Sequence, residues 1–275
     1  MNDSQRIYLD NAATSFPKPP SVIEAITRYS TDLGASPGRG GYAEARAATR
    51  LMEECRERIN TLIHGESPRH IIFTLNATDA LNLAIKGILR HRLRHARNTP
   101  AHVITTWMEH NSVLRPLNAL EAEGVVQTRV RCDSQTGIVN PEDIRHAILP
   151  ETALVVVSHC SNVTGTLQPI GEIGLICRKL GIPFLVDAAQ SLGHVDLDVR
   201  ALNIDLLAFP GHKGLLGPLG TGGLYIRPGL EKVLLPLREG GTGSASEHDV
   251  QPGILPDCYE AGSHNMVGIV GLSEG

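Results

Sequence analysis

Two residues in the second half of the chain, Asp187 and Lys213, could act together on one small ligand. Asp187 lies at the end of the apolar run in 181–192, G-I-P-F-L-V-D-A-A-Q-S-L. Lys213 lies in a glycine-bounded loop, where a Pro-Gly pair breaks the apolar run 204–209. Glycines allow a ligand to approach the backbone closely. A lone loop lysine is usually a solvated turn residue, so Lys213 becomes a candidate because Asp187 precedes it.

A loop amine and a strand-end carboxylate are the groups that a pyridoxal phosphate site needs. The lysine amine forms a Schiff base, and the carboxylate keeps the pyridine nitrogen protonated so that the ring accepts electrons. The sequence therefore predicts pyridoxal phosphate as the cofactor, with Lys213 at the centre of its site.

The elements that must position these groups alternate between strands and helices from residue 70 onward. The apolar runs V-V-V and F-L-V predict strands that are buried on both faces. We therefore expect an α/β fold with a mostly parallel central sheet and helices on both faces. Expected strands are 70–75, 103–107, 125–132, 153–159, 183–186, 204–209 and 223–226, and expected helices are 78–94, 112–123, 141–149 and 170–180.

The first part of the chain is less regular. Prolines hold residues 7–20 in an extended segment. Ser21 is then a candidate N-cap, with Glu24 at the capping-box position, for a helix that ends near residue 31. The glycine-rich stretch 34–42 predicts a loop, and the spacing of apolar residues predicts a helix over 43–64.

Polar residues follow most of the expected strands, at the sheet edge where this fold class binds ligands. The helix start at 76–79, with Asn76 as the expected N-cap and Asp79 at N3, could cradle a phosphate or simply be a well-capped terminus. His110 could stack on a flat ring and move protons, or it could be a structural histidine. Asn162 and Gln190 could each contact an oxygen of the cofactor ring, or could form a turn or begin a helix.

Seven segments of the chain carry a resemblance to a known family, in the order in which that family has them. They are Y-L-D-N-A-A-T, N-A-T-D-A-L-N-L-A, M-E-H-N-S, S-H-C-S-N-V-T-G-T, L-V-D-A-A-Q-S, F-P-G-H-K-G-L-L-G-P-L-G and Y-E-A-G-S-H-N. The chain resembles the class V group of pyridoxal-phosphate enzymes, and within it the cysteine desulfurase and selenocysteine lyase branch. The resemblance implies the fold type I of pyridoxal-phosphate-dependent transferases.

The resemblance also implies a role for each candidate residue. Lys213 resembles the Schiff-base lysine, and His110 resembles the histidine that stacks on the ring and transfers protons. Asp187 resembles the partner of the pyridine nitrogen. The remaining cofactor contacts are Asn162 and Gln190 at the ring substituents, Ala77, Thr78 and His212 at the phosphate, and Ser263 at the phosphate of a neighbouring subunit. The last contact implies a homodimer with shared sites.

The chain departs from the family pattern in two ways. Pro210 stands where the family often has a phosphate-binding serine. None of the five cysteines occupies the position of the family's sulfur-accepting nucleophile, which comes from a smaller C-terminal domain together with a carboxylate-binding arginine. We therefore expect a truncated chain: an extended segment and helix over 1–30, a large cofactor-binding domain over 31–256, and over 257–275 the start of a connection to a missing domain.

The resemblance implies a cysteine desulfurase, which takes sulfur from L-cysteine as an enzyme persulfide and leaves alanine. In this truncated chain we expect reduced activity or none. A class V aminotransferase, a selenocysteine lyase and a non-catalytic scaffold or dimerisation partner are the alternatives. Cysteine is the expected substrate, and a sulfur-acceptor protein is a possible partner. A nucleotide-binding protein is disfavoured, because neither of the glycine-rich phosphate-binding patterns G-x-G-x-x-G and G-x-x-x-x-G-K-[ST] follows the expected strands.

Composition sets broader limits. The 275 residues carry a formal net charge of −4, which gives no electrostatic reason to expect nucleic-acid binding. No apolar run approaches membrane-spanning length and the N-terminus has no apolar signal region, so we expect a cytoplasmic protein. Neither a disulfide framework nor a metal site is expected, and the five cysteines should be reduced and mostly buried.

Overall fold

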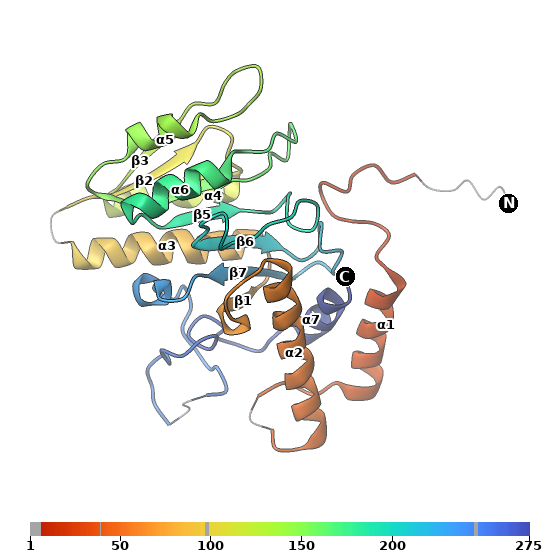
Figure 1. The fold of residues 1–275 in the computed structure, drawn as a ribbon. Helices are drawn as coiled ribbons and strands as arrows, with labels where there is room; N and C mark the ends of the chain where they lie inside the picture. Colours follow the sequence, from red (N-terminus) through yellow and green to blue (C-terminus); the bar gives the residue numbers. More distant parts are fainter. Residues whose placement is uncertain (1–6, 39, 97–98, 245–246) are drawn as a thin grey trace.

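A seven-stranded sheet crosses the middle of the computed structural model, which describes residues 7–38, 40–96, 99–244 and 247–275 (Figure 1). The strand order is β1-β7-β6-β5-β4-β2-β3. Strand β7 runs in the direction opposite to that of the other six strands. The strands are β1 (Ile71–Thr74), β2 (Ala101–Thr106), β3 (Val125–Val130), β4 (Thr152–Ser158), β5 (Phe184–Asp187), β6 (Leu206–Pro210) and β7 (Gly222–Ile226). The prediction of a mostly parallel sheet is confirmed.

Helices cover both faces of this sheet because successive side chains of a strand point to opposite faces. In β4, for example, Val155 and Val157 pack on one face, whereas Leu154 and Val156 pack on the other. The first face carries α2 (Ala43–Leu62), α5 (Pro141–Ala147), α6 (Ile170–Leu180) and α7 (Met266–Ser273). The second face carries α3 (Ala77–His95) and α4 (Asn111–Leu120). Short 3₁₀ turns occur at Pro68–His70, Glu121–Glu123 and Leu230–Val233.

The N-terminal helix differs from its prediction. Helix α1 spans Pro20–Arg28, and a π-helical turn continues it over Tyr29–Leu33. The predicted N-cap, Ser21, is wrong: the capping position is Pro19, which has no capping side chain. The Ser21 hydroxyl instead donates to the backbone carbonyl of Glu274 at 3.2 Å. The helix begins earlier than predicted because proline at the first helical position needs no hydrogen-bond acceptor for its nitrogen.

The apolar run near the C-terminus forms α7, which lies between α1 and α2 (Figure 1). Its residues Met266, Ile269, Val270 and Leu272 are buried in the same core cluster as the first sheet face. The apolar surface of this segment is therefore covered within the chain. The division into a large domain and a connecting segment stays a prediction. In the described residues, no helix combines the length and the apolar character needed to cross a bilayer.

A buried ion pair joins α2 to the segment that precedes α7. Arg56 is fully buried and forms a two-bond contact with Glu260, at 2.7 Å (Nη1–Oε1) and 2.5 Å (Nη2–Oε2). Glu260 also accepts a hydrogen bond from the backbone N–H of Phe73 at 2.6 Å. Burial opposes the charge on Glu260, but the charges of Arg56 and His264 outweigh it and hold its pKa below the usual value. The pair therefore fixes residues 260–264 against β1 and α2.

Replacing Arg56 by methionine should lower the free energy of unfolding by about 3–5 kcal/mol, because the buried Glu260 carboxylate loses its two-bond partner and keeps only the His264 ring beside it. Arg58→Met is the matched control. Arg58 lies on α2 like Arg56, but its ion pair with Glu274 is exposed. The control should cost less than about 1 kcal/mol. Denaturant unfolding measures both variants, and equal losses would contradict the importance of the buried pair.

Candidate active site

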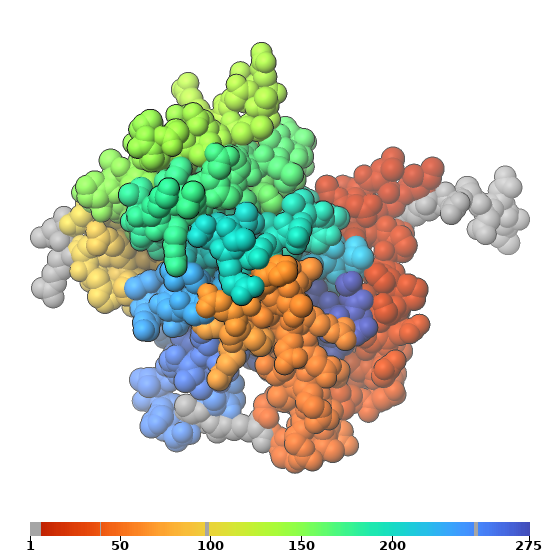
Figure 2. All heavy atoms as spheres, viewed as in Figure 1, coloured from red at the N-terminus to blue at the C-terminus, as the bar shows by residue number. Residues whose placement is uncertain are grey.

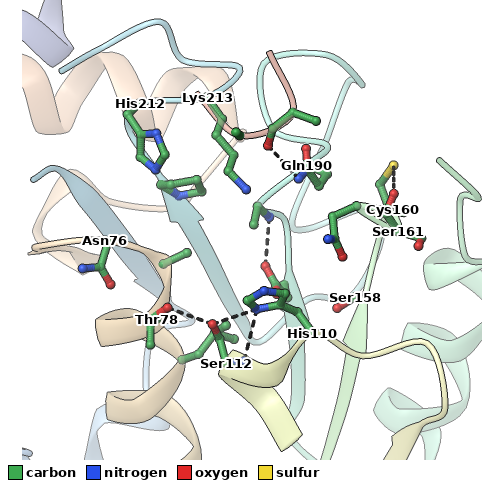
Figure 3. Close-up of a pocket in the computed structure, with 18 of the residues that line it drawn as sticks. Asn76, Thr78, His110, Ser112, Ser158, Cys160, Ser161, Gln190, His212 and Lys213 are labelled. Atoms are coloured by element: carbon green, nitrogen blue, oxygen red, sulfur yellow. Dashed lines mark hydrogen bonds between the residues drawn. The ribbon is translucent and has the colours of Figure 1, made fainter. Parts of the chain in front are cut away.

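A cavity of about 360 Å³ opens at the carboxyl edge of the sheet, where β2, β4, β5 and β6 end (Figure 3). Eight of the nine residues predicted as cofactor contacts line it: Ala77, Thr78, His110, Asn162, Asp187, Gln190, His212 and Lys213. The parallel topology brings them together, because it places the ends of these strands at one edge. That these residues contact a cofactor stays a prediction.

Asp187 is the last residue of β5 and is 4% exposed. Its Oδ1 accepts a hydrogen bond from the backbone N–H of Ala189 at 2.9 Å. Burial raises the pKa of Asp187, although the Ala189 N–H and the charges of His110 and Lys213 oppose the rise. Of the ion pairs found among the described residues, none includes Asp187. A buried carboxylate without such an ion pair is stabilised by a ligand that brings a cationic group.

Lys213 follows β6 and extends its amine into the cavity (Figure 3). Within the described parts of the chain, no hydrogen bond or ion pair is found for its Nζ atom. Burial lowers the pKa of Lys213, and the charge of Asp187 only partly opposes this effect. A lowered pKa makes more of the amine neutral and nucleophilic at neutral pH than in an exposed lysine.

His110 begins α4, and its ring nitrogen caps the helix. The Nδ1 atom accepts from the backbone N–H of Ser112 at 3.1 Å and lies 2.9 Å from the Ser112 hydroxyl. A neutral His110 must therefore carry its proton on Nε2. The Ser112 hydroxyl also lies 2.8 Å from the Thr78 hydroxyl, which links the starts of α4 and α3 (Figure 3). This chain of contacts fixes the orientation of the imidazole.

The start of α3, beside the start of α4, also lines the cavity. The Asn76 side chain accepts from the backbone N–H of Asp79 at 2.9 Å, so the predicted N-cap is confirmed. Ala77 and Thr78 occupy the first helical turn and line the cavity. Their N–H groups have no acceptor within the helix, and the helix dipole favours negative charge at this end. The arrangement suits a phosphate group.

The N-terminal segment forms a wall of the cavity that the sequence did not predict. Asp10, Ala12 and Ala13 line it. The Gln190 side chain donates to the backbone carbonyl of Ala12 at 3.0 Å. In Figure 2 this segment (red) lies beside the part of the chain around residues 190–215 (cyan). The motif Y-L-D-N-A-A-T was the signal that could have identified this wall.

The backbone carbonyl of His212, one peptide bond before Lys213, receives hydrogen bonds from this segment. Donors lie within 3.1 Å of it, namely the backbone N–H and hydroxyl of Ser15, the hydroxyl of Thr14, and the ammonium of Lys18 at 2.9 Å. The His212 ring also contacts the Thr14 hydroxyl, with Nδ1 at 3.0 Å. The segment therefore holds the loop that presents Lys213.

Several other residues that line the cavity were also missed. Ser112 and Ser158 occur within predicted elements, and nothing in their residue type marks them. Cys160 lines the cavity too, but its thiol lies 3.6 Å from the carbonyl of Gly165, and burial raises its pKa. Burial likewise raises the pKa of the other four free cysteines, Cys55, Cys132, Cys177 and Cys258. None of these thiols is activated as a thiolate in this structure.

Two further observations concern the remaining site predictions. Ser263 lies outside the cavity and lines a smaller one beside Arg238 and His264, so its expected contact across a subunit boundary stays a prediction. In the described part of the chain, no group of three or more His, Cys, Asp or Glu side chains could hold a metal ion.

The family model for class-V aminotransferases matches residues 7–275. The chain belongs to this family. Class-V enzymes use pyridoxal phosphate, so the predicted cofactor class is confirmed. Solved structures with the same fold confirm fold type I.

Relatives of the class-V chain cover nearly all of it. A probable cysteine desulfurase of Methanothermobacter thermautotrophicus is 40% identical over 269 residues, which is 97% of this chain and 64% of the relative. The apo structure of a cysteine desulfurase from Thermococcus onnurineus NA1 matches with a TM-score of 0.86 and 34% identity, over 98% of this chain and 66% of that one. A structure described as SspA in complex with cysteine has a TM-score of 0.85 and 33% identity, over 98% and 71%.

The chain thus spans less than two thirds of the length of the methanogen relative. The activity, substrate and partners of the whole protein are therefore proposals.

Replacing Lys18 by methionine should lower the free energy of unfolding by about 1–3 kcal/mol, because the His212 carbonyl loses a charged donor. Limited proteolysis should also cut the N-terminal segment faster. Lys179→Met, on the exposed side of α6, is the control and should stay within about 0.5 kcal/mol of wild type. A Lys18 variant that matches the control in both measurements would show that the segment does not hold the loop.

Proposed function

We propose that this chain is the cofactor-binding part of a cysteine desulfurase, which removes sulfur from L-cysteine and leaves alanine. The observation that carries the proposal is the placement of the Asp187 carboxylate and the Lys213 amine in one cavity. The names of the relatives support cysteine as the substrate, since they are cysteine desulfurases or a protein in complex with cysteine.

The residues of the cavity fit pyridoxal phosphate. Asp187 is buried without an ion-pair partner among the described residues, and a protonated ring nitrogen would supply the missing cation. The start of α3 and His212 offer N–H donors for the phosphate, whereas Asn162 and Gln190 could contact ring substituents. When bound, pyridoxal phosphate would supply an aldehyde that reacts with amines and a protonated ring that accepts electrons.

Each side chain then has a definite task in our proposal. Asp187 keeps a proton on the ring nitrogen, because its buried charge is stabilised by that proton. Lys213 would supply the amine that holds the cofactor, and its Nζ could give or take a proton, which its lowered pKa favours. His110 lines the same cavity and could give or take a proton at Nε2, since Nδ1 accepts a hydrogen bond from the Ser112 N–H.

Acceptance of the sulfur is assigned to a thiolate other than the five cysteines described above. Burial raises the pKa of each of these five thiols, and a protonated thiol is a poor nucleophile. We therefore propose that this chain binds cofactor and substrate, and that none of these five thiols forms the persulfide.

A homodimer with shared sites and a sulfur-acceptor protein belong to the proposal as well. The position of Ser263 supports the first, because Ser263 is exposed and lies outside the cavity of Lys213, where a neighbouring subunit could contact it. Localisation in the cytoplasm stays a prediction from the sequence.

Purified protein mixed with pyridoxal phosphate should show a visible absorbance band of the lysine-bound cofactor, and Lys213→Ala should abolish it. Asp187→Asn should weaken cofactor binding at least about tenfold, because a charged hydrogen bond contributes about 1.5–3 kcal/mol. Lys179→Ala is the matched control and should behave as wild type. A colourless wild-type protein, or a Lys213→Ala variant that keeps the band, would refute the proposed cofactor site.

The substrate is tested in the full-length protein. Incubation with L-cysteine should release alanine and sulfide, whereas an aminotransferase would instead transfer the amino group to a keto acid. L-selenocysteine as the only substrate turned over would identify a selenocysteine lyase, and bound cofactor without any half-reaction would identify a scaffold.

A further inference from the structure

A buried glutamate, Glu109, lies beneath the cavity and has no role in the function proposed above. It precedes His110 in the turn after β2 and is 8% exposed. Its carboxylate accepts from the Thr106 hydroxyl at 2.7 Å, from the Ser158 hydroxyl at 2.7 Å, and from the Ser158 backbone N–H at 2.9 Å. Of the ion pairs among the described residues, none includes Glu109.

Glu109 fills a gap in the sheet. The pairing of β2 with β4 ends at Ile104 and Val155, before either strand ends. Beyond that point the N–H of His159 bonds to β5, at the carbonyl of Asp187. Because alternate N–H groups of a strand point to opposite sides, the N–H of Ser158 faces the side where β2 has diverged. The Glu109 carboxylate accepts a hydrogen bond from this N–H, which a backbone carbonyl of β2 would accept if the two strands were still paired.

Ser158 links Glu109 to the cofactor partner. In the register of β4 and β5, Ser158 lies directly beside Asp187, and both residues line the cavity. The Ser158 hydroxyl has one proton to donate. In this structure the hydroxyl donates to Glu109 at 2.7 Å, and it also lies close enough to Asp187 to lower the pKa of that carboxyl group. Two buried carboxyl groups therefore lie on either side of a single hydroxyl group.

We propose that Glu109 is a positioning residue of this cavity: its carboxyl group holds Ser158 beside Asp187 and sets the charge state of Asp187 through that contact. The inference rests on the proposed function, in that Asp187 is taken as the partner of the cofactor ring. Glu109 itself touches neither cofactor nor substrate.

The surroundings of Glu109 support this role. Burial raises its pKa to about 7, against the hydrogen bonds from Thr106 and Ser158, and the charge of Asp187 raises it further. The other titratable groups nearby are Cys132 after β3 and His110 at the start of α4, with Lys213 beyond Asp187. A protonated Glu109 donates a hydrogen bond to the Ser158 oxygen, so that the Ser158 hydroxyl can donate its own hydrogen bond to Asp187. An ionised Glu109 accepts the hydrogen bond of the Ser158 hydroxyl and repels the negative charge of Asp187.

The first test measures the dissociation constant for pyridoxal phosphate at fixed pH. Glu109→Ala should weaken binding about tenfold, because Ser158 loses its acceptor. Glu109→Gln keeps the shape and, like a protonated carboxyl group, can accept from Thr106 and donate to Ser158, so it should stay within about threefold of wild type. The exposed Glu172→Gln is the control. Should Glu109→Ala fail to fold, Ser158→Ala replaces it, with the same direction expected. Wild-type affinity in the alanine variant would overturn the proposal.

The second test needs no cofactor. Isotope-edited infrared or carbon NMR spectra of the apo chain follow the carboxyl group of Asp187 during a pH titration. Glu109→Gln should move this titration to lower pH, because it removes a like charge and frees the Ser158 proton. A merely structural glutamate would leave the titration unchanged, which would also overturn the proposal. If wild type binds no pyridoxal phosphate, the proposed function fails, and this titration still decides the role of Glu109.

The third test uses thermal stability of the apo chain. A glutamate with a pKa near 4.5 when unfolded and about 7 when folded binds more protons in the folded state between these values. Its contribution to stability is therefore complete at low pH and is lost as the pH rises from about 4.5 to about 7. Glu109→Gln should lose less stability than wild type over this range. Parallel stability curves for the two proteins would contradict the raised pKa of Glu109.

Discussion

The structure depends on keeping a carboxylate and an amine in one cavity without letting them form an ion pair. Asp187 is the last residue of β5, and Lys213 lies three residues after the end of β6, the parallel strand beside it. Burial raises the pKa of the acid and lowers that of the amine. Each group is therefore poised for a ligand that lies between them, and a ring with a basic nitrogen and an aldehyde satisfies both.

Three further sets of contacts hold the residues of the cavity in place. The N-terminal segment holds the His212 carbonyl and thereby the loop of Lys213. Glu109 and Ser158 occupy the gap between β2 and β4 and support Asp187 from below. The Thr78, Ser112 and His110 contacts fix the imidazole against the helix starts. Positions far apart in the sequence thus contribute because strand ends and helix starts meet at one edge of the sheet.

The sequence was sufficient for the groups that have distinctive chemistry and was insufficient for the contacts that hold them. Strand burial on both faces, a lysine after a Pro-Gly break and a strand-end aspartate are local patterns, so β5, β6, Asp187 and Lys213 could be recognised. The support of the His212 carbonyl spans almost 200 positions, and no local pattern encodes such a contact. The prediction of Ser21 as an N-cap failed for a related reason. Its hydroxyl donates to the distant carbonyl of Glu274 instead of capping its own helix.

One measurement tests the shared cavity most directly: the nitrogen NMR signal of pyridoxal phosphate labelled at its ring nitrogen, bound to this chain at neutral pH. If Asp187 and Lys213 contact opposite ends of one ring, wild type should show a protonated ring nitrogen and Asp187→Asn a deprotonated one, with the cofactor still joined to Lys213 in both. The same nitrogen signal in wild type and Asp187→Asn would contradict the placement of the cofactor between these two residues.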